Sequence, residues 1–290
     1  MEQQIINGIL LGSTYSLIAI GYSLVFGLLK LINLAQGEIF MVGGFLGLMF
    51  IKVFHVPFFL AVLLAMAGAG LMGLLLELIC FRPVKRHYFL APALSTLGFG
   101  IIIRESIVNF LGSEPQVFPA GVNLPDLHFG HLMISSVQMV VLGLSVLLLV
   151  ALIFLIQKTE LGYSIRALSE NTVAARLLGI RVNKTTMITF FISAALAGAA
   201  GMLIGLRIEK ISPFIGATLG MKGLAIMIIG GLGNIKGAML GGLLVGLIEV
   251  LTSAYLGAVY TDAVPWGLLF LVLVFWPEGI FGSKNSADRV

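Results

Sequence analysis

The stretch QKTELGYSIRALSENTVAARLLGIRVNK, residues 157–184, is a long polar segment between two strongly apolar parts of the chain. Its charged residues are Lys158, Arg166, Arg176, Arg181 and Lys184 against Glu160 and Glu170. Since the sequence on either side is apolar enough to lie in lipid, this stretch must lie in water. An apolar stripe follows it at three- and four-residue steps, through Ile165, Leu168, Thr172, Ala175 and Leu178. Such spacing places these residues on one face of a short helix.

Turn-forming residues divide the same stretch. Ser169 and Asn171 can cap or turn the backbone near its middle, and Gly179 can end a helix. We therefore predict a small amphipathic helix, or two helical pieces, outside the bilayer, with an apolar face that would fit a groove on a partner. An ordinary solvated loop is the alternative that the periodicity leaves open.

The composition indicates what surrounds this segment. The chain has 290 residues, of which 59% are hydrophobic and 10% charged, and its mean hydropathy is +1.10. Soluble domains carry roughly a quarter charged residues, so we predict an all-α polytopic membrane protein. The single cysteine, Cys80, excludes an internal disulfide and a cysteine-ligated metal cluster. The net charge of +4 concerns orientation in the membrane and not nucleic acid.

Nine apolar runs are long enough, or nearly so, to cross about 30 Å of hydrocarbon. They are Ile5–Leu29, Asn33–Ile51, Pro57–Cys80, Leu90–Leu111, Leu132–Ile156, Thr186–Leu206, Leu219–Leu232, Gly237–Leu256 and Ala263–Gly282. The seventh is short and glycine-rich, so a half-helix is the alternative there. We predict one membrane domain over residues 1–290 with about nine crossings, and eight or ten are the alternatives.

The positions of lysine and arginine predict the orientation. With nine crossings the basic connections share one side, which places the N-terminus outside, residues 157–184 in the cytoplasm and Gly112–His131 in the periplasm. Besides those of the polar segment, the basic residues on this side are Lys30, Arg82, Lys85, Arg86, Lys236, Lys284 and Arg289. Lys52 and the segment Arg207–Lys210 fall on the outer side and fit less well.

Small residues recur four apart within the apolar runs. The pairs are Gly43 and Gly47, Gly201 and Gly205, Gly237 and Gly241, and Gly242 and Gly246. Each pair lies on one helical face, where the missing side chains permit close backbone approach between helices. The pairs predict a compact bundle and carry no information on substrate.

Polar residues also lie inside the apolar runs. Asn33, Gln36 and Glu38 stand at the start of the second run, in INLAQGEIFMVGG, and must face protein or a water-filled cavity. They are either a polar patch on a path through the membrane, together with Gly37, or interfacial groups at a helix end. Glu249 lies in the middle of the eighth run and needs a partner, for which Arg104 is one candidate.

Catalytic and metal-binding patterns are not found in the sequence. It has no G-x-x-x-x-G-K-[ST] loop for ATP and no G-x-S-x-G elbow for nucleophilic catalysis. Its histidines, His55, His87, His128 and His131, do not form a ligand set. We therefore expect no enzymatic activity, no metal and no cofactor in this chain.

Several stretches, taken in order, carry a resemblance to a known family. They are NGILLGSTYSLIAIGYSLVFG (Asn7–Gly27), INLAQGEIFMVGG (Ile32–Gly44), RALSENTVAARLLGI (Arg166–Ile180), GMKGLAIMIIGGLGNIKGAMLGG within Gly220–Gly246, and WPEGIFG (Trp276–Gly282). Over about Asn7 to Gly282 the chain resembles the inner-membrane permease subunits of ABC importers for branched-chain amino acids, of the shorter, LivH-like type. Gln36 stands where the family most often has histidine, which leaves the substrate open.

The resemblance implies a mechanism and a set of partners. A cytoplasmic coupling loop, residues 157–185, would dock in a groove of an ATPase subunit and transmit its closure to the permease. The residues implied in that contact are Arg166, Ala167, Glu170, Asn171, Ala174, Ala175, Leu178 and Gly179. The implied partners are a second, homologous permease subunit, two cytoplasmic ATPases and a periplasmic binding protein, in a bacterial inner membrane.

Two alternatives remain at this point. One is a self-sufficient ion-coupled transporter or channel, in which Glu249, Arg104 and Glu38 would act as relay groups. The other is the same importer architecture carrying urea, short amides or other amino acids. The residues expected to border the path in either case are Asn33, Gln36, Gly37, Glu38 and Glu249.

Overall fold

The computed structural model describes residues 1–83, 90–119, 127–129 and 132–282. Nine long α-helices correspond one to one with the nine apolar runs within these residues. They are α1 (Glu2–Leu29), α2 (Gln36–Lys52), α3 (Phe58–Leu76), α4 (Leu90–Leu111), α5 (Ser136–Lys158), α8 (Val182–Ile208), α9 (Ile215–Gly230), α10 (Ile235–Tyr255) and α11 (Ala263–Phe275). Two short helices, α6 (Glu160–Glu170) and α7 (Thr172–Leu177), lie in the polar stretch. The predicted all-α polytopic architecture is confirmed.

Helix length separates the nine into two groups. Six are long and apolar enough to cross a membrane by length and composition: α1, α3 with its π-helical extension Glu77–Phe81, α4, α5, α8 and α10. The helices α2, α9 and α11 have 17, 16 and 13 residues. The sequence indicated a shortened helix only for α9, so the short α2 and α11 are findings of the structure.

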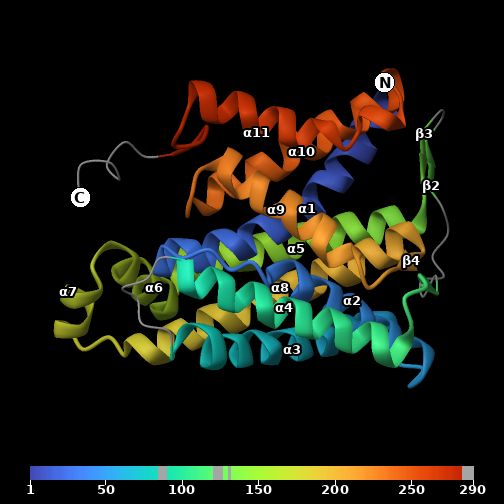
Figure 1. Cartoon of the computed structure of the whole chain (residues 1–290). Helices are drawn as coiled ribbons and strands as arrows, with labels where there is room; N and C mark the ends of the chain where they lie inside the picture. Colours follow the sequence, from blue (N-terminus) through green and yellow to red (C-terminus); the bar gives the residue numbers. More distant parts are fainter. Residues whose placement is uncertain (84–89, 120–126, 130–131, 283–290) are drawn as a thin grey trace.

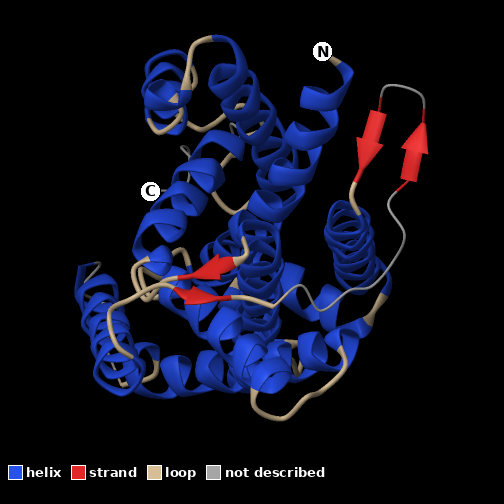
Figure 2. Ribbon diagram, turned by 90° about the vertical axis from the view of Figure 1, so that its right-hand side faces the viewer, coloured by secondary structure: helices blue, strands red, loops and turns tan. Residues whose placement is uncertain are grey.

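The long helices lie side by side, and short elements occupy the two ends of the bundle (Figure 1). One end holds α6 and α7, and the other holds the N-terminus and the hairpin of β2 (Leu127–Phe129) and β3 (Leu132–Ile134). At this second end, β1 (Gln116–Val117) also pairs antiparallel with β4 (Lys210–Ile211) (Figure 2). Of the basic residues used for orientation, Lys85, Arg86, Lys284 and Arg289 lie outside the described residues, as does part of Gly112–His131.

Glycine contacts bring the central helices together. The helix α1 is the most buried of the membrane-span candidates, and it packs against α10 and α8. Gly246 of α10 lies directly against the backbone of Gly12, and Gly43 of α2 against that of Gly198 in α8. A side chain at either position would meet backbone atoms, so the close approach predicted from the glycine spacing is confirmed at these contacts.

Two helices begin inside the bundle. The side chain of Gln36, the first residue of α2, donates to Ser193, which lies about 16 Å along α8 from Val182. The first turn of α9 lies against the same place, because Gly216 contacts the backbone of Gly37. The first turns of α2 and α9 therefore meet in the interior, and both helices are short because the chain enters the bundle before each one starts.

Candidate functional site

The polar segment folds as a helical hairpin, which confirms the prediction of two helical pieces. Thr159 caps α6, and its side chain accepts a hydrogen bond from the backbone N–H of Gly162 at 3.2 Å. Asn171 separates the helices and caps α7, because its Oδ1 accepts from the N–H groups of Val173 and Ala174 at 2.9 and 3.0 Å. Gly179 ends the hairpin with φ of 85°, a conformation that favours glycine.

The apolar stripe of the hairpin faces two ways. Ile165, Leu168 and Ala175 are buried and pack against Leu28 at the end of α1, and Ala175 is only 2% exposed. Leu178, by contrast, is 80% exposed. The expectation that the whole stripe faces a partner is therefore corrected, because the end of α1 supplies an apolar surface for most of it within the same chain.

The residues implied in coupling divide in the same way. Those exposed to solvent are Arg166, Glu170, Asn171, Ala174, Leu178 and Gly179. Ala167 is half-buried beside the Leu28 cluster, and Ala175 lies inside it. The guanidinium group of Arg166 stacks over the ring of Tyr163 at 4.8 Å. Val173 and Leu177 are also exposed and lie near Leu178 in sequence, so the free surface of α7 is more apolar than the predicted set implies.

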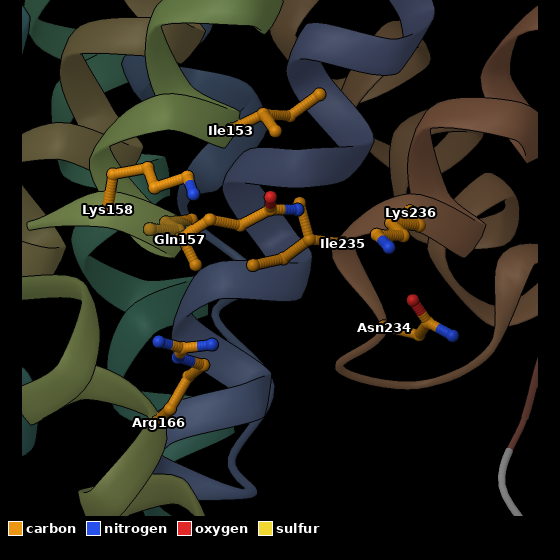
Figure 3. A pocket seen from close by; sticks show the side chains of 8 residues that line it. Ile153, Gln157, Lys158, Arg166, Asn234, Ile235 and Lys236 are labelled. Carbon is orange, nitrogen blue, oxygen red and sulfur yellow. The ribbon is translucent and has the colours of Figure 1, made fainter.

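A concave basic surface adjoins the hairpin. A pocket of about 490 Å³ lies between the end of α5, the middle of α6 and the start of α10. Figure 3 shows the polar ends of Lys158, Arg166 and Lys236 around this space, with Gln157 and Asn234 beside them. The side chain of Asn234 caps α10, accepting from Gly237 N at 3.1 Å and donating to Phe281 O at 2.7 Å. This end of the molecule thus offers a cationic hollow next to exposed apolar side chains.

The amides at the start of α2 hold that helix in place. Asn33 Nδ2 donates to Gln36 Oε1 at 3.0 Å, and Gln36 Nε2 donates to the carbonyl and hydroxyl oxygens of Ser193 at 3.1 and 3.0 Å. The Ser193 hydroxyl in turn donates to Gly21 O at 2.7 Å. These groups are buried and satisfied by protein, which places them in the interior and not at a helix end in the interface.

Glu38, two residues later, has a different environment. Its Oε1 lies 3.6 Å from Nη1 of Arg104 on α4. Its Oε2 is buried against Gly216 and has no hydrogen-bond partner among the described residues. The pair borders a cavity of about 260 Å³ between α2, α4 and α9. Glu38 therefore lines a cavity that opens toward the exposed side chains of Leu97, Ile101 and Met221. That Asn33, Gln36, Gly37 and Glu38 border a path through the membrane stays a prediction.

Glu249 belongs to a separate cluster. Lys222 of α9 donates to Glu249 Oε1 and Asp262 Oδ1, each at 2.9 Å, and the Tyr15 hydroxyl donates to Glu249 Oε1 at 3.2 Å. The suggested pairing of Glu249 with Arg104 is wrong, because each has another partner. The sequence analysis missed Lys222, although a lysine inside the apolar run GMKGLAIM is a signal that a buried carboxylate lies nearby.

These features define a class of protein: a multi-pass α-helical membrane protein with ion pairs and interrupted helices in its interior, and a surface hairpin at one end. The family described as "Branched-chain amino acid transport system / permease component" matches residues 4–273. The chain belongs to this family of branched-chain amino acid transport permeases.

Individual relatives agree with this assignment. The chain is 37% identical to the high-affinity branched-chain amino acid transport system permease protein LivH of Escherichia coli K12, over 98% of this chain and 96% of the relative. It is 35% identical to BraD of Pseudomonas aeruginosa over the same shares. A more distant relative, LivM of E. coli K12, is 28% identical over 92% of this chain and 67% of its own length. No solved structure matches the chain.

Proposed function

We propose that this chain is a permease subunit of an ATP-driven importer for branched-chain amino acids, and that α6 and α7 dock on a cytoplasmic ATPase. The substrate class follows the names of relatives that the chain matches over nearly its full length. The two-sided hairpin is the observation that supports docking. One face is fixed to α1, and the other presents Val173, Leu177 and Leu178 to solvent.

The attachment of the hairpin suggests how a push would reach the bundle. Ile165 and Leu168 of α6 pack on Leu28, and α8 begins three residues after Gly179. A force on α7 would therefore move the ends of α1 and α8 together. Both helices contact α2, whose first turn borders the Glu38 cavity. ATP hydrolysis in the partner could in this way change access to the interior.

The proposal extends to partners and location. The likeness of this chain to both LivH and LivM supports a complex of two related permeases. Two ATPases would bind at the α6–α7 end, and a periplasmic binding protein would deliver substrate at the β2–β3 end. The basic pocket of Lys158, Arg166 and Lys236 supports a cytoplasmic position for the α6–α7 end. The complex would lie in a bacterial inner membrane.

Replacing Leu178 with aspartate tests the docking surface. Leu178 is 80% exposed, so the substitution leaves the permease fold intact, but it would put a charge into an apolar contact. We expect Leu178→Asp to lose its ATPases during purification and to lose leucine uptake. Ala175→Arg is a less direct test, because Ala175 is buried against α1 and its loss would disturb the hairpin itself.

Val259→Asp is the matched control. Val259 is 90% exposed at the opposite end of the bundle, away from the proposed docking surface, so its variant should keep the ATPases through purification. Normal ATPase retention and uptake in Leu178→Asp would contradict the docking proposal. A self-sufficient transporter, driven by an ion gradient, would then be favoured.

A further inference from the structure

The cavity beside Glu38 combines opposite charges with an apolar wall. It has a volume of about 260 Å³ and lies between the first turns of α2 and α9 and one face of α4. Pockets for drug-sized ligands begin at about 300 Å³, so this space suits a smaller solute. Leu34, Leu97, Ile101 and Met221 form the apolar part of its lining.

The carboxylate of Glu38 has unused bonding capacity. Glu38 is 7% exposed, and its Oε2 has no hydrogen-bond donor within the described chain. Its contact with Arg104 through Oε1 is loose, at 3.6 Å. A buried carboxylate oxygen without a donor is costly, because it has lost water and gained nothing in return. Oε2 itself is buried against Gly216, but an ammonium group in the cavity would give Oε1 a close donor in place of the loose contact with Arg104.

The other polar groups of the cavity favour an anion. Arg104 lies at its edge, where Nη1 is 3.6 Å from Glu38 Oε1 and Nε is 3.4 Å from Oε1 of the exposed Glu105. The first turns of α2 and α9 meet there, and the first N–H groups of a helix lack partners within the helix and carry partial positive charge. Gly37, Gly216 and Gly220 contact one another at this point, so no side chain separates the two backbones. The Tyr22 hydroxyl lies beside Gly220.

We propose that this cavity binds an α-amino acid in its zwitterionic form. The α-ammonium group would bind Glu38, the α-carboxylate would bind Arg104 and the helix N-termini, and an aliphatic side chain would pack on Leu97, Ile101 and Met221. This inference rests on the proposed function and adds a binding site within this one subunit. A zwitterion carries no net charge into the membrane. Its ammonium group would replace Arg104 as the partner of Glu38, and its carboxylate would replace Glu38 as the partner of Arg104.

The same geometry excludes the alternative substrates. Urea and short amides carry no full charge. They therefore cannot replace the interaction energy that is lost when Glu38 and Arg104 move apart. An analogue that lacks either the ammonium or the carboxylate group would pair with only one of the two residues, Glu38 or Arg104. The cavity therefore distinguishes between the substrates that the family resemblance left open.

The test is ligand-dependent thermal stabilisation of the purified permease–ATPase complex without its binding protein. The ligands are leucine, leucinamide (no carboxylate), 4-methylpentanoate (no ammonium) and urea. We expect leucine to stabilise the complex at concentrations at least about tenfold lower than the two analogues, because each analogue lacks one charge-assisted contact. Urea should have no effect. Glu38→Gln should abolish the preference for leucine over 4-methylpentanoate, and Arg104→Gln the preference over leucinamide.

Two further variants separate binding from folding. Glu114 is an exposed carboxylate beyond the end of α4 at Leu111, so Glu114→Gln should keep the full preference for leucine. Leu97→Phe narrows the cavity without removing a charge. It should weaken the binding of leucine more than the binding of alanine. The proposal is wrong if leucine does not stabilise the wild-type complex, if urea does so equally, or if Glu38→Gln and Arg104→Gln keep the wild-type order of ligands. Retention of the ATPases by the same preparations tests the proposed function separately.

Discussion

Two ion pairs in the interior of this permease differ in closeness and surroundings. Lys222 Nζ and Glu249 Oε1 are 2.9 Å apart, both residues are almost fully buried, and the Tyr15 hydroxyl also donates to Glu249 Oε1. Glu38 and Arg104 are 3.6 Å apart and border a cavity, and Arg104 is partly exposed. The first pair joins α9 to α10, whereas the second borders a cavity between α2, α4 and α9. In both pairs the Oε2 of the glutamate has no hydrogen-bond partner among the described residues.

The difference indicates different roles. A close, buried pair offsets part of the cost of burying its own charges and joins two helices, so removing one partner should affect stability. A loose pair beside a cavity retains bonding capacity that a ligand can use, so its removal should affect binding first. A charged residue inside the membrane therefore does not by itself mark the transport path. The two pairs differ in the distance between their charged groups and in the presence of an adjoining cavity.

Lys222→Met should have the largest effect on stability. It leaves Glu249 buried without its cation, and breaking a buried pair from one side costs about 3–5 kcal/mol. We expect poor recovery of the purified permease and a large loss in free energy of unfolding, measured by chemical denaturation in mixed micelles. A variant as stable as the wild type would show that the pair is not a structural contact.

Glu249→Gln should have an intermediate effect. Lys222 keeps Asp262 as a partner, and the amide oxygen of glutamine can still accept from Tyr15. The expected loss is about 1–3 kcal/mol, the range for a weakened bond to a charged group. The same denaturation assay measures it, and a loss equal to that of Lys222→Met would contradict the assumed contribution of Asp262.

Asp262→Asn should have the smallest effect. The Asp262 side chain is 84% exposed in the connection before α11, and exposed ion pairs contribute up to about 1 kcal/mol. We expect this variant to be purified and to unfold almost as the wild type does. A larger loss would mean that Asp262, and not Glu249, is the main partner of Lys222.

The helices of this fold could be predicted because hydropathy acts over each run as a whole. All nine runs contain a helix, and the caps of the hairpin were visible as Asn171 and Gly179. The start of α2 inside the bundle was not predicted. It depends on Ser193, a residue 157 positions away that accepts hydrogen bonds from Gln36.

The partners of charged groups were harder to predict than their need for a partner. Glu38, Arg104 and Glu249 were recognised as costly in lipid, but periodicity does not determine which helices are neighbours. Arg104 was therefore suggested for Glu249, whereas α4 lies against α2 and brings it to Glu38. Ala175 was placed on an outward face for the same reason, since the stripe shows which residues share a face and not what covers them.

The central claim is that the Glu38 pair serves substrate binding and the Glu249 pair serves structure. It is tested most directly by measuring leucine uptake and free energy of unfolding side by side for Glu38→Gln and Glu249→Gln, in the full complex. We expect Glu38→Gln to lose at least about tenfold in uptake with stability within about 1 kcal/mol of wild type, since its pair is loose and partly exposed. Glu249→Gln should lose stability while each folded complex still transports leucine. The claim would be contradicted if Glu38→Gln lost as much stability as Glu249→Gln while its folded complexes took up leucine at the wild-type rate.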